Sequence, residues 1–490
     1  KQDFNLVGSP FAGMLYELHG NQGSQTQEDL CYDSWMGYMN TPTPFTSNVN
    51  NTTYYVRWNS YWGRQYGNVM SPARQVIRLA KENGLPMFET WANLIRILSM
   101  SRVSAIHGPV IYSNYGSTAA TVLYDKESDL YNLFFAQLDT IQTQFNANKT
   151  YAGFAKFDPS YKGSIPAWQK VVNSVRLKLA MRISKVNPAL AKTQGEKALA
   201  DANGLIATNA DNFNISLLGN IMPVGMICFQ WDDARMGAPI ESFMVGLKDG
   251  RIAKYFSPAD NASLYADHPT SPYKGIRNGA FLDAKIQRVT FSKVSTDFNS
   301  VQTRRHFTAS EVHFLRAEAA LRGWTGAGDA KTNYETGVRL SFADWGAGGV
   351  DAYLADATSK PINYVDPVDS RNNFTATSTI TVAWNEADSR ELKLEKIMTQ
   401  KYLATFTNTL EAWVDHRRTG YPKIPSAARN DSGDEWGVIP AGQFIKRWPF
   451  VAGEVTGNAA AVTDALSKMG ATKNDISTRL WWDTGVASNF

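Results

Sequence analysis

The chain has little of what several classes of protein depend on. Only two cysteines occur in 490 residues, Cys31 and Cys228, and neither belongs to a CxxC or Cys/His pair. Their isolation argues against a disulfide framework and a structural zinc site. The most continuous apolar stretch, residues 215–231, is interrupted by Gly, Pro and Asn and falls short of the roughly 20 residues that span a bilayer. We expect two free, buried thiols and no transmembrane helix.

Charge of one sign is also scarce. The chain carries 49 Lys and Arg against 45 Asp and Glu, a net charge of +4, and its longest basic runs are pairs such as Arg304-Arg305 and Arg417-Arg418. A nucleic-acid-binding protein usually gathers its basic residues into a patch or stripe. Nucleic acid is therefore not an expected partner.

Catalytic signatures are missing as well. The six histidines form no HExxH or i, i+4 pair, and the sequence has no GxSxG elbow, GxGxxG turn or phosphate-binding loop. Asp232-Asp233 is the clearest candidate for the paired carboxylates of a glycoside hydrolase, but adjacent aspartates are common in loops. An acid and base distant in sequence remain open. We predict a protein that is not an enzyme and that uses no metal or other cofactor.

Several segments have both the capping residues and the apolar spacing of helices. Thr308, three residues before Glu311, forms a capping-box pattern, and Asp329 can cap a second helix after a Gly-rich turn. Residues 308–342 therefore read as a helical hairpin of tetratricopeptide-like type. Further helices are predicted at 72–82, 86–107 and 128–145, after Ser164-Ile165-Pro166, and from 388 to about 406, where Asp388 and Glu391 are the expected cap.

Elsewhere the helical periodicity fades and Gly, Pro, Asn and Asp interrupt short aromatic runs. No change in composition marks a linker, so the sequence predicts an all-α fold in one domain, 1–490, with a tetratricopeptide-like helical scaffold and few short strands. The scaffold is expected mainly at 10–205, 308–342 and 388–418. Loop-rich segments on the ligand side are expected at about 38–60, 206–305, 343–385 and 420–490, because binding residues tend to lie on loops that a rigid scaffold positions.

Aromatic residues are abundant. The chain has 14 Trp and 21 Tyr, and several stand in polar, irregular segments, whereas Trp62 and Trp168 have helical spacing and are expected in the core. A flat ring can lie against the C–H face of a sugar while neighbouring polar side chains bind its hydroxyl groups. The same mixture could bind an extended peptide, and composition does not separate the two.

The C-terminal half carries recognisable motifs. They are Ala383-Trp384-Asn385-Glu386, the run Leu394 to Tyr402 (LEKIMTQKY) and the run Glu411 to Pro422 (EAWVDHRRTGYP), accompanied by 176–183, 314–320, Tyr273-Lys274-Gly275 and Leu480-Trp481-Trp482-Asp483. Together these segments resemble the SusD/RagB family of nutrient-binding outer-membrane lipoproteins of Bacteroidetes, and its SusD-like branch in particular.

The resemblance implies a scaffold of four tetratricopeptide-like helix pairs and a role in nutrient uptake. Family members are anchored by a lipid to the extracellular face of the outer membrane, bind glycans or sometimes peptides without cleaving them, and close over a SusC-like TonB-dependent barrel. The lipid anchor would lie upstream of Lys1. The motifs at 384–386 and 411–422 are expected to be structural, with Arg-carboxylate pairs that tie helices together.

In family members with a known glycan site, aromatic residues from the loop after the first helices and from the middle of the chain form the binding platform. The corresponding candidates here are Tyr38, Phe45, Tyr55, Trp58, Trp231 and Tyr273. We therefore expect capture of an oligosaccharide for delivery to the barrel. A peptide-binding member of the family is the alternative, and a glycoside hydrolase is a weaker one.

Overall fold

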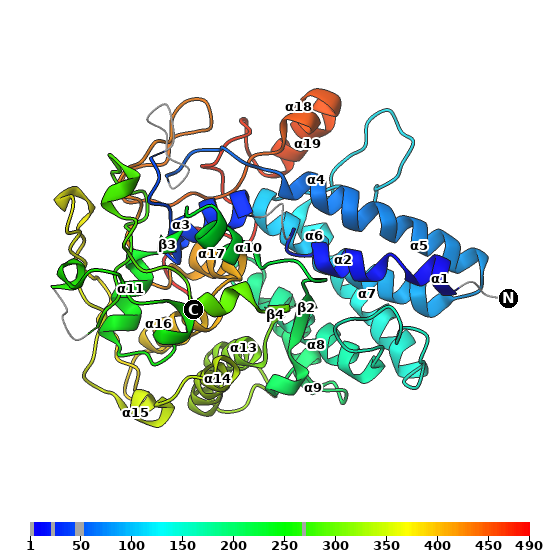
Figure 1. Cartoon of the computed structure of the whole chain (residues 1–490). Coiled ribbons are helices and arrows are strands. Elements are labelled where there is room, and N and C mark those ends of the chain that lie inside the picture. The colour runs from blue at the N-terminus through cyan, green and yellow to red at the C-terminus, as the bar shows by residue number, and fades with distance from the viewer. Residues whose placement is uncertain (1–3, 21–24, 45–52, 267–270) are drawn as a thin grey trace.

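The protein is a helical assembly with two short β ladders (Figure 1). The computed structural model describes residues 4–20, 25–44, 53–266 and 271–490. The helices of the first half are α1 Phe4–Gly8, α2 Phe11–Glu17, α3 Asp33–Met36, α4 Tyr61–Gln65, α5 Ser71–Glu82, α6 Pro86–His107, α7 Glu127–Ala147, α8 Ile165–Arg182, α9 Pro188–Ala200, α10 Pro223–Gly225 and α11 Ala238–Gly246. Those of the second half are α12 Ile252–Tyr255, α13 Ala309–Leu321, α14 Ala330–Trp345, α15 Val350–Ala355, α16 Arg390–Ala404, α17 Thr409–Thr419, α18 Ala452–Gly457 and α19 Ala459–Lys468. Short π-helical segments are η2 Gln25–Tyr32, η3 Tyr66–Met70 and η5 Met226–Gln230.

Side-chain caps start α13 and α14 where the sequence predicts them. The Thr308 side chain accepts the N–H of Glu311 at 3.3 Å, and that of Asp329 accepts the N–H of Thr332 at 2.7 Å. These caps satisfy amide groups that the first turn of a helix leaves unpaired. The predicted hairpin at 308–342 is confirmed as α13 and α14.

The expected cap of α16 is wrong by one residue. Ser389 is the cap, and its hydroxyl accepts the N–H of Leu392 at 3.2 Å. Asp388 instead forms an ion pair with Lys396 at 2.8 Å. Both residues are good capping types, so their sequence alone did not distinguish them.

Consecutive helices pack against each other along the scaffold. Helix α5 packs on α6, α8 on α9 and α13 on α14, and α16 packs on α13 and α17. In Figure 1 the blue and cyan helices run side by side toward the N-terminal end, and the α13–α14 hairpin lies beside α16. Helix α6 is buried along most of its length because α2, α4, α5, α7 and α17 surround it. The predicted all-α, tetratricopeptide-like fold is confirmed.

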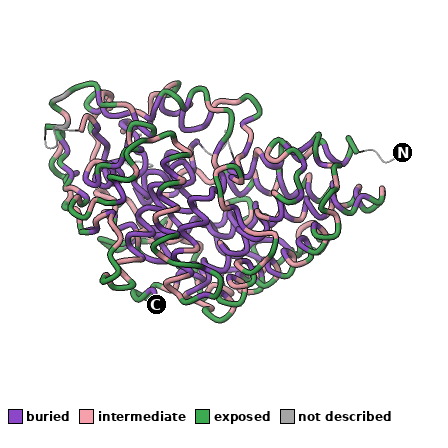
Figure 2. Tube along the Cα trace, turned by 90° about the horizontal axis from the view of Figure 1, so that it is seen from below, coloured by how far each residue is buried: buried purple, intermediate pink, exposed green. Residues whose placement is uncertain are grey.

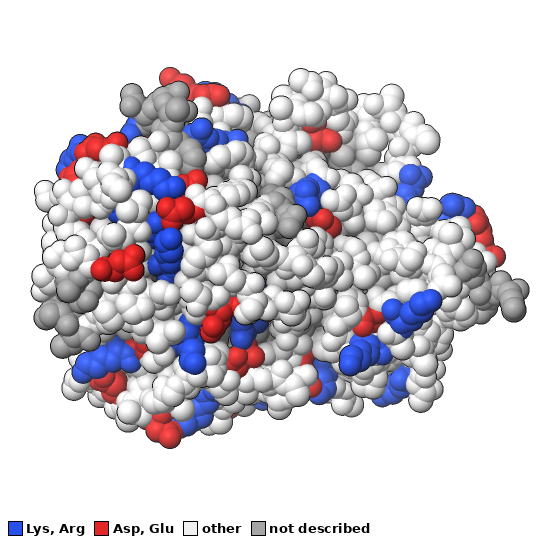
Figure 3. All heavy atoms as spheres, viewed as in Figure 1, with Lys and Arg blue, Asp and Glu red and all other residues white. Residues whose placement is uncertain are grey.

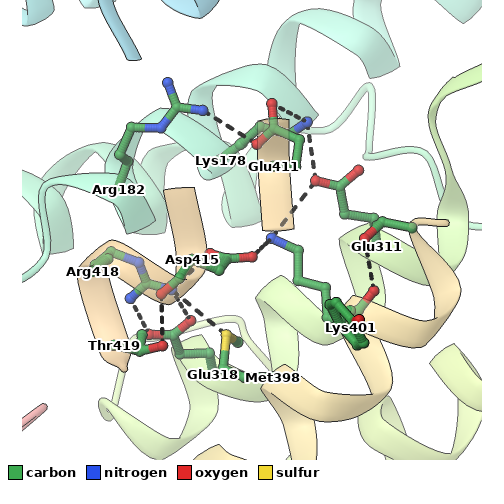
Figure 4. Close-up of polar contacts among 12 residues, drawn as sticks. Lys178, Arg182, Glu311, Glu318, Met398, Lys401, Glu411, Asp415, Arg418 and Thr419 are labelled. Carbon is green, nitrogen blue, oxygen red and sulfur yellow. Dashed lines mark hydrogen bonds and ion pairs between the residues drawn. The ribbon is translucent and has the colours of Figure 1, made fainter. Parts of the chain in front are cut away.

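Buried ion pairs join four of these helices (Figure 4). Arg418 on α17 donates to both carboxylate oxygens of Glu318 on α13, at 2.6 and 2.7 Å. Lys401 on α16 lies 2.6 Å from Asp415 on α17. The five-donor fork of arginine matches a carboxylate in this two-bond geometry.

Glu411 is the second centre of the same network. Its carboxylate lies 3.2 Å from Arg182 and 3.6 Å from Lys178, both on α8, and 3.8 Å from Arg102 on α6. Burial alone would raise the pKa of Glu411, but these cations hold it well below the usual range. The motif at 411–422 therefore connects helices across the scaffold, as its residue types indicated.

Two antiparallel ladders fasten the loop-rich part to the scaffold. Strand β1 (Met39–Asn40) pairs with β3 (Arg235–Met236), and β2 (Phe213–Ser216) pairs with β4 (Thr303–Phe307), which leads into α13. Segments far apart in sequence are thereby placed side by side. Figure 2 shows buried residues concentrated along the inner helices and exposed residues on the outer loops.

The loop-rich segments contain more helix than their periodicity suggests. Helix α11 lies between 206 and 305, α15 lies between 343 and 385, and α18 and α19 lie between 420 and 490. Almost every residue of α11 is buried, so it lacks the polar face that would produce an amphipathic pattern. The other three are short or rich in Gly and Ala.

The core is strongly aromatic. Trp35 is in ring contact with Tyr32, Trp413 and Trp448 at centroid distances of 4.9 to 5.2 Å. Trp62 and Trp168 are buried, as their spacing predicted. Both cysteines are buried and free, which confirms that prediction also.

Candidate functional site

Trp231 is the most exposed tryptophan among the candidates. It follows the π-helical segment η5, and 43% of its surface is exposed. Its backbone N–H donates to the carbonyl of Met226 at 3.1 Å, which fixes the chain at this point. An exposed indole on a fixed backbone presents an apolar face to solvent. This is the geometry that a sugar-binding platform needs.

A polar cluster borders Trp231. Asp232 accepts hydrogen bonds from Arg235 and Lys293, each at 2.8 Å, and Asp233 pairs with Lys285 at 3.0 Å. Burial by itself would raise the pKa of Asp232, but the bonds from Lys293 and Arg235 bring it below the usual range. The Asp232 carboxylate is therefore held ionised by cations, which does not suit the proton donor that a glycoside hydrolase requires.

Chain segments from both ends of the sequence meet on this side of the molecule. Thr43 donates a hydrogen bond to Asp233. Thr53 donates to Asp431 at 3.0 Å, and Tyr55 donates to Glu435 at 3.3 Å. The segments 41–44 and 231–235 thus lie side by side in a loop-rich surface that we call the Trp231 face, and 53–55 contacts 431–435.

Two of the six candidates are wrong because the structure buries them. Tyr38 is 0% exposed, stacks on Tyr402 with ring centroids 4.4 Å apart, and donates to the Tyr402 carbonyl at 2.5 Å. Tyr273 is 7% exposed and precedes Lys274, which pairs with the buried Glu241 at 3.2 Å. Tyr38 fastens its loop to α16 and offers no ring to a ligand, and Tyr273 offers little of its ring.

The other candidates have mixed positions. Tyr55 and Trp58 are half-buried, and the Trp58 carbonyl accepts the indole N–H of Trp448 at 2.9 Å. Phe45 lies outside the described residues. Tyr55 contacts Glu435, and among the residues described no ring contact joins Tyr55 to Trp231. Their role in binding stays a prediction.

Sequence reasoning missed two residues beside Trp231. The Lys285 ammonium lies 3.5 Å from the Trp231 carbonyl, and the next residue, Ile286, is 75% exposed. The guanidinium of Arg235 holds this segment in place through the Val289 carbonyl, at 2.8 and 3.0 Å. Nothing in the local run DAKIQ distinguishes it from an ordinary polar loop, so only the fold reveals its position.

Two histidines are kept neutral by burial. Burial lowers the pKa of His107 and of His416 to about 3, so both imidazoles are neutral at pH 7. Within the described ranges no group of three or more His, Cys, Asp or Glu side chains could hold a metal ion. Among the same residues, no helix combines the length and the hydrophobicity needed to cross a bilayer.

Charges of both signs are scattered over the face of the molecule in Figure 3. Lys and Arg lie beside Asp and Glu, and no broad patch of one sign is visible on this face. A nucleic acid or other polyanion would need such a patch. The face suits a neutral ligand better.

Comparison with known proteins decides the family. The model of the SusD-like family, described as SusD and RagB outer membrane lipoprotein, matches residues 1–483. The chain belongs to the SusD/RagB family. None of the curated proteins matches it.

Solved SusD-like structures have the same fold over nearly the whole chain. A chitin-binding SusD homologue from Flavobacterium johnsoniae is 38% identical, with a TM-score of 0.92, covering 99% of this chain and 100% of that one. A SusD homologue from Bacteroides uniformis is 33% identical (TM-score 0.86, covering 98% and 99%). A SusD-like protein from Bacteroides thetaiotaomicron is 29% identical (TM-score 0.88, covering 97% and 98%). The family description places SusD-like proteins at the outer membrane.

Proposed function

We propose that this SusD-like protein is a non-catalytic, lipid-anchored protein on the extracellular face of the outer membrane. It captures oligosaccharides on the Trp231 face and delivers them to a SusC-like TonB-dependent transporter. The exposed indole of Trp231 beside a charged polar cluster carries the proposal. Oligosaccharides of chitin are the first ligands to test, because the similar Flavobacterium johnsoniae protein is a chitin-binding SusD homologue.

The chemistry of the Trp231 face fits a neutral sugar chain. One face of a pyranose ring is lined with C–H groups that can lie on the indole, while Asp233 can accept from hydroxyl groups and Lys285 can donate to them. If a sugar covers roughly 60 Å² of the indole, burial at about 25 cal/mol per Å² contributes about 1.5 kcal/mol. That corresponds to about a tenfold change in Kd.

A partner barrel and a lipid anchor complete the proposal. The family description supports the anchor, since the family consists of outer-membrane lipoproteins. Purification of the native protein in mild detergent should recover a large TonB-dependent barrel in the same complex, and recovery of the protein alone under conditions that preserve such complexes would contradict delivery to it.

Isothermal titration against a panel of glycans and a mixed oligopeptide pool tests the ligand class. We expect heat from one glycan class, with no new reducing ends afterwards. Heat from peptides alone would move the function to peptide import. Release of reducing sugar would show a hydrolase and contradict the role given to Asp232 and Asp233.

A further inference from the structure

A second cavity lies at a different place from the Trp231 face. It has a volume of about 570 Å³, within the range of roughly 300–1,000 Å³ that ligand pockets occupy. Helix α4, the loop 111–122 and helix α18 border it, and Figure 1 shows this loop projecting beside α18 and α19. Its principal lining residues are Trp62, Tyr66, Ile111, Tyr115, Glu454 and Asn458.

The aromatic wall of this cavity is rigid. Tyr66 and Tyr115 lie with ring centroids 5.6 Å apart and planes at 34°. The Tyr66 hydroxyl donates to the Ile111 carbonyl at 3.0 Å and accepts the Ile111 N–H at 2.8 Å. Arg74 on α5 holds the loop by donating to the Gly116 carbonyl at 3.1 Å. A rigid wall costs little ordering when a ligand binds.

Polar groups along the same cavity keep unused hydrogen-bonding capacity. Glu454 accepts through Oε2 alone, from the Tyr124 hydroxyl and from the Asn458 side-chain amide at 3.5 Å, and Asn458 also donates to the Val122 carbonyl at 2.9 Å. Within the described part of the chain, Glu454 Oε1 and Asn458 Oδ1 accept no hydrogen bond, and the indole N–H of Trp62 donates none although Trp62 is 3% exposed. The cavity thus offers two acceptors and one donor beside aromatic rings.

Three helical glycines line the cavity, and neither their backbone conformation nor a close contact requires glycine there. Gly63 is in α4, and Gly453 and Gly457 are one turn apart in α18. None has a positive φ, and a Cβ added at any of them would meet no atom within 4 Å. Glycine destabilises a helix relative to alanine. A molecule that fills the cavity would explain why side chains are absent from these three positions.

We infer that this cavity binds a sugar ring and is a second glycan site. Tyr115 and Tyr66 supply the apolar wall, Glu454 and Asn458 accept from hydroxyl groups, and the glycines leave room for the ring. A neutral ligand fits because the lining residues described include no Lys, Arg or His and one carboxylate, Glu454. The inference rests on the proposed function, since it assigns the same class of ligand to a separate place.

Substitutions at the glycines test whether the cavity is a ligand site or only a gap in the packing. Gly453→Ala/Gly457→Ala should raise Tm, because alanine favours helix, and should weaken sugar binding at this cavity about tenfold or more. Gly13→Ala is the matched control: Gly13 lies in α2, away from the cavity lining, and its added Cβ also meets no atom within 4 Å. It should change the Tm in the same direction and leave binding unchanged.

The titrant is the tetrasaccharide of β-1,4-linked N-acetylglucosamine, and the readouts are stoichiometry and Kd. The wild type should bind two molecules per chain, while Trp231→Ala and the double glycine variant should each retain one. One site in the wild type that Trp231→Ala abolishes would overturn the cavity site and leave the proposed function standing. One site in the wild type that only the glycine variant abolishes would support the cavity site and overturn binding on the Trp231 face. No binding by the wild type would overturn the cavity site along with chitin as the ligand.

Discussion

The buried pair Arg418–Glu318 allows a quantitative test of how the scaffold is held together. Both side chains are at most 1% exposed, and two hydrogen bonds of 2.6 and 2.7 Å join them. Arg418→Met leaves the Glu318 carboxylate buried with only Arg322 as a cation, at 2.8 Å. Removing one member of a buried pair typically costs about 3–5 kcal/mol, because the remaining charge loses its compensation.

The pKa of Glu318 gives the magnitude by a second route. Burial would raise this pKa, but Arg418 and Arg322 lower it from 4.5 to about 2. A shift of about 2.5 units corresponds to about 3 kcal/mol at 1.36 kcal/mol per unit. Because the folded-state pKa is depressed, this stability is present above pH 4.5 and is lost as the pH falls from 4.5 through 2.

Urea unfolding followed by tryptophan fluorescence measures both effects. Arg418→Met should lower the free energy of unfolding by about 3–5 kcal/mol at pH 7. The matched control is Arg78→Met, which breaks an exposed ion pair with Glu82 on α5 worth about 0.3–0.5 kcal/mol. Glu318→Gln should reduce the loss of stability between pH 4.5 and 2 relative to wild type. Equal effects of the two Arg→Met variants, or an unchanged acid slope in Glu318→Gln, would refute the reasoning.

Three further predictions concern other buried positions. Burial raises the pKa of Asp29 from 3.8 to about 8, and it raises the pKa of the neighbouring Asp33 as well. The folded state therefore keeps a proton that the unfolded state releases, and stability falls as the pH rises from 3.8 through 8. Asp29→Asn should make this fall smaller in urea titrations at pH 5 and 8, and an unchanged pH profile would contradict it. Both cysteines are buried, and burial raises the pKa of Cys228 to about 11. Iodoacetamide at pH 8 should therefore alkylate neither thiol until urea unfolds the chain, and mass spectrometry measures this. Gly37 and Gly84 both have a positive φ, but of the two only Gly37 would place a new Cβ against other atoms, at 2.3 Å. Gly37→Ala should therefore lower the free energy of unfolding by about 1–3 kcal/mol more than Gly84→Ala. Equal losses would show that φ alone matters.

The scaffold could be predicted because its signals are local. Thr308 and Asp329 each cap a helix by binding an amide three residues further along the chain. The apolar residues of α13 and α14 repeat at helical spacing. Helix α11 was not predicted because it is buried on all sides. It therefore lacks the polar face that gives a helix its hydrophobic periodicity. Fold and family were thus accessible from the sequence, whereas fully buried short helices were not.

The candidate site depends on contacts between distant segments, and local sequence could not rank its residues. Tyr38 and Trp231 both stand in polar, irregular runs, yet Tyr38 is covered by Tyr402, which is 364 positions away. Lys285 and Ile286 come beside Trp231 only through tertiary contacts, including the bond between Lys285 and Asp233. Composition correctly suggested that some aromatic residues would be exposed, but the fold decided which ones.

The central claim is that the exposed indole of Trp231 binds a sugar. Its most direct test is isothermal titration of wild type, Trp231→Ala and Phe4→Ala with the chitin tetrasaccharide; Phe4 is an aromatic residue of α1 that is 36% exposed, outside the Trp231 face. The account predicts that Trp231→Ala weakens binding at one site about tenfold or more with an unchanged Tm, while Phe4→Ala binds like wild type. Equal affinities in all three proteins would contradict it.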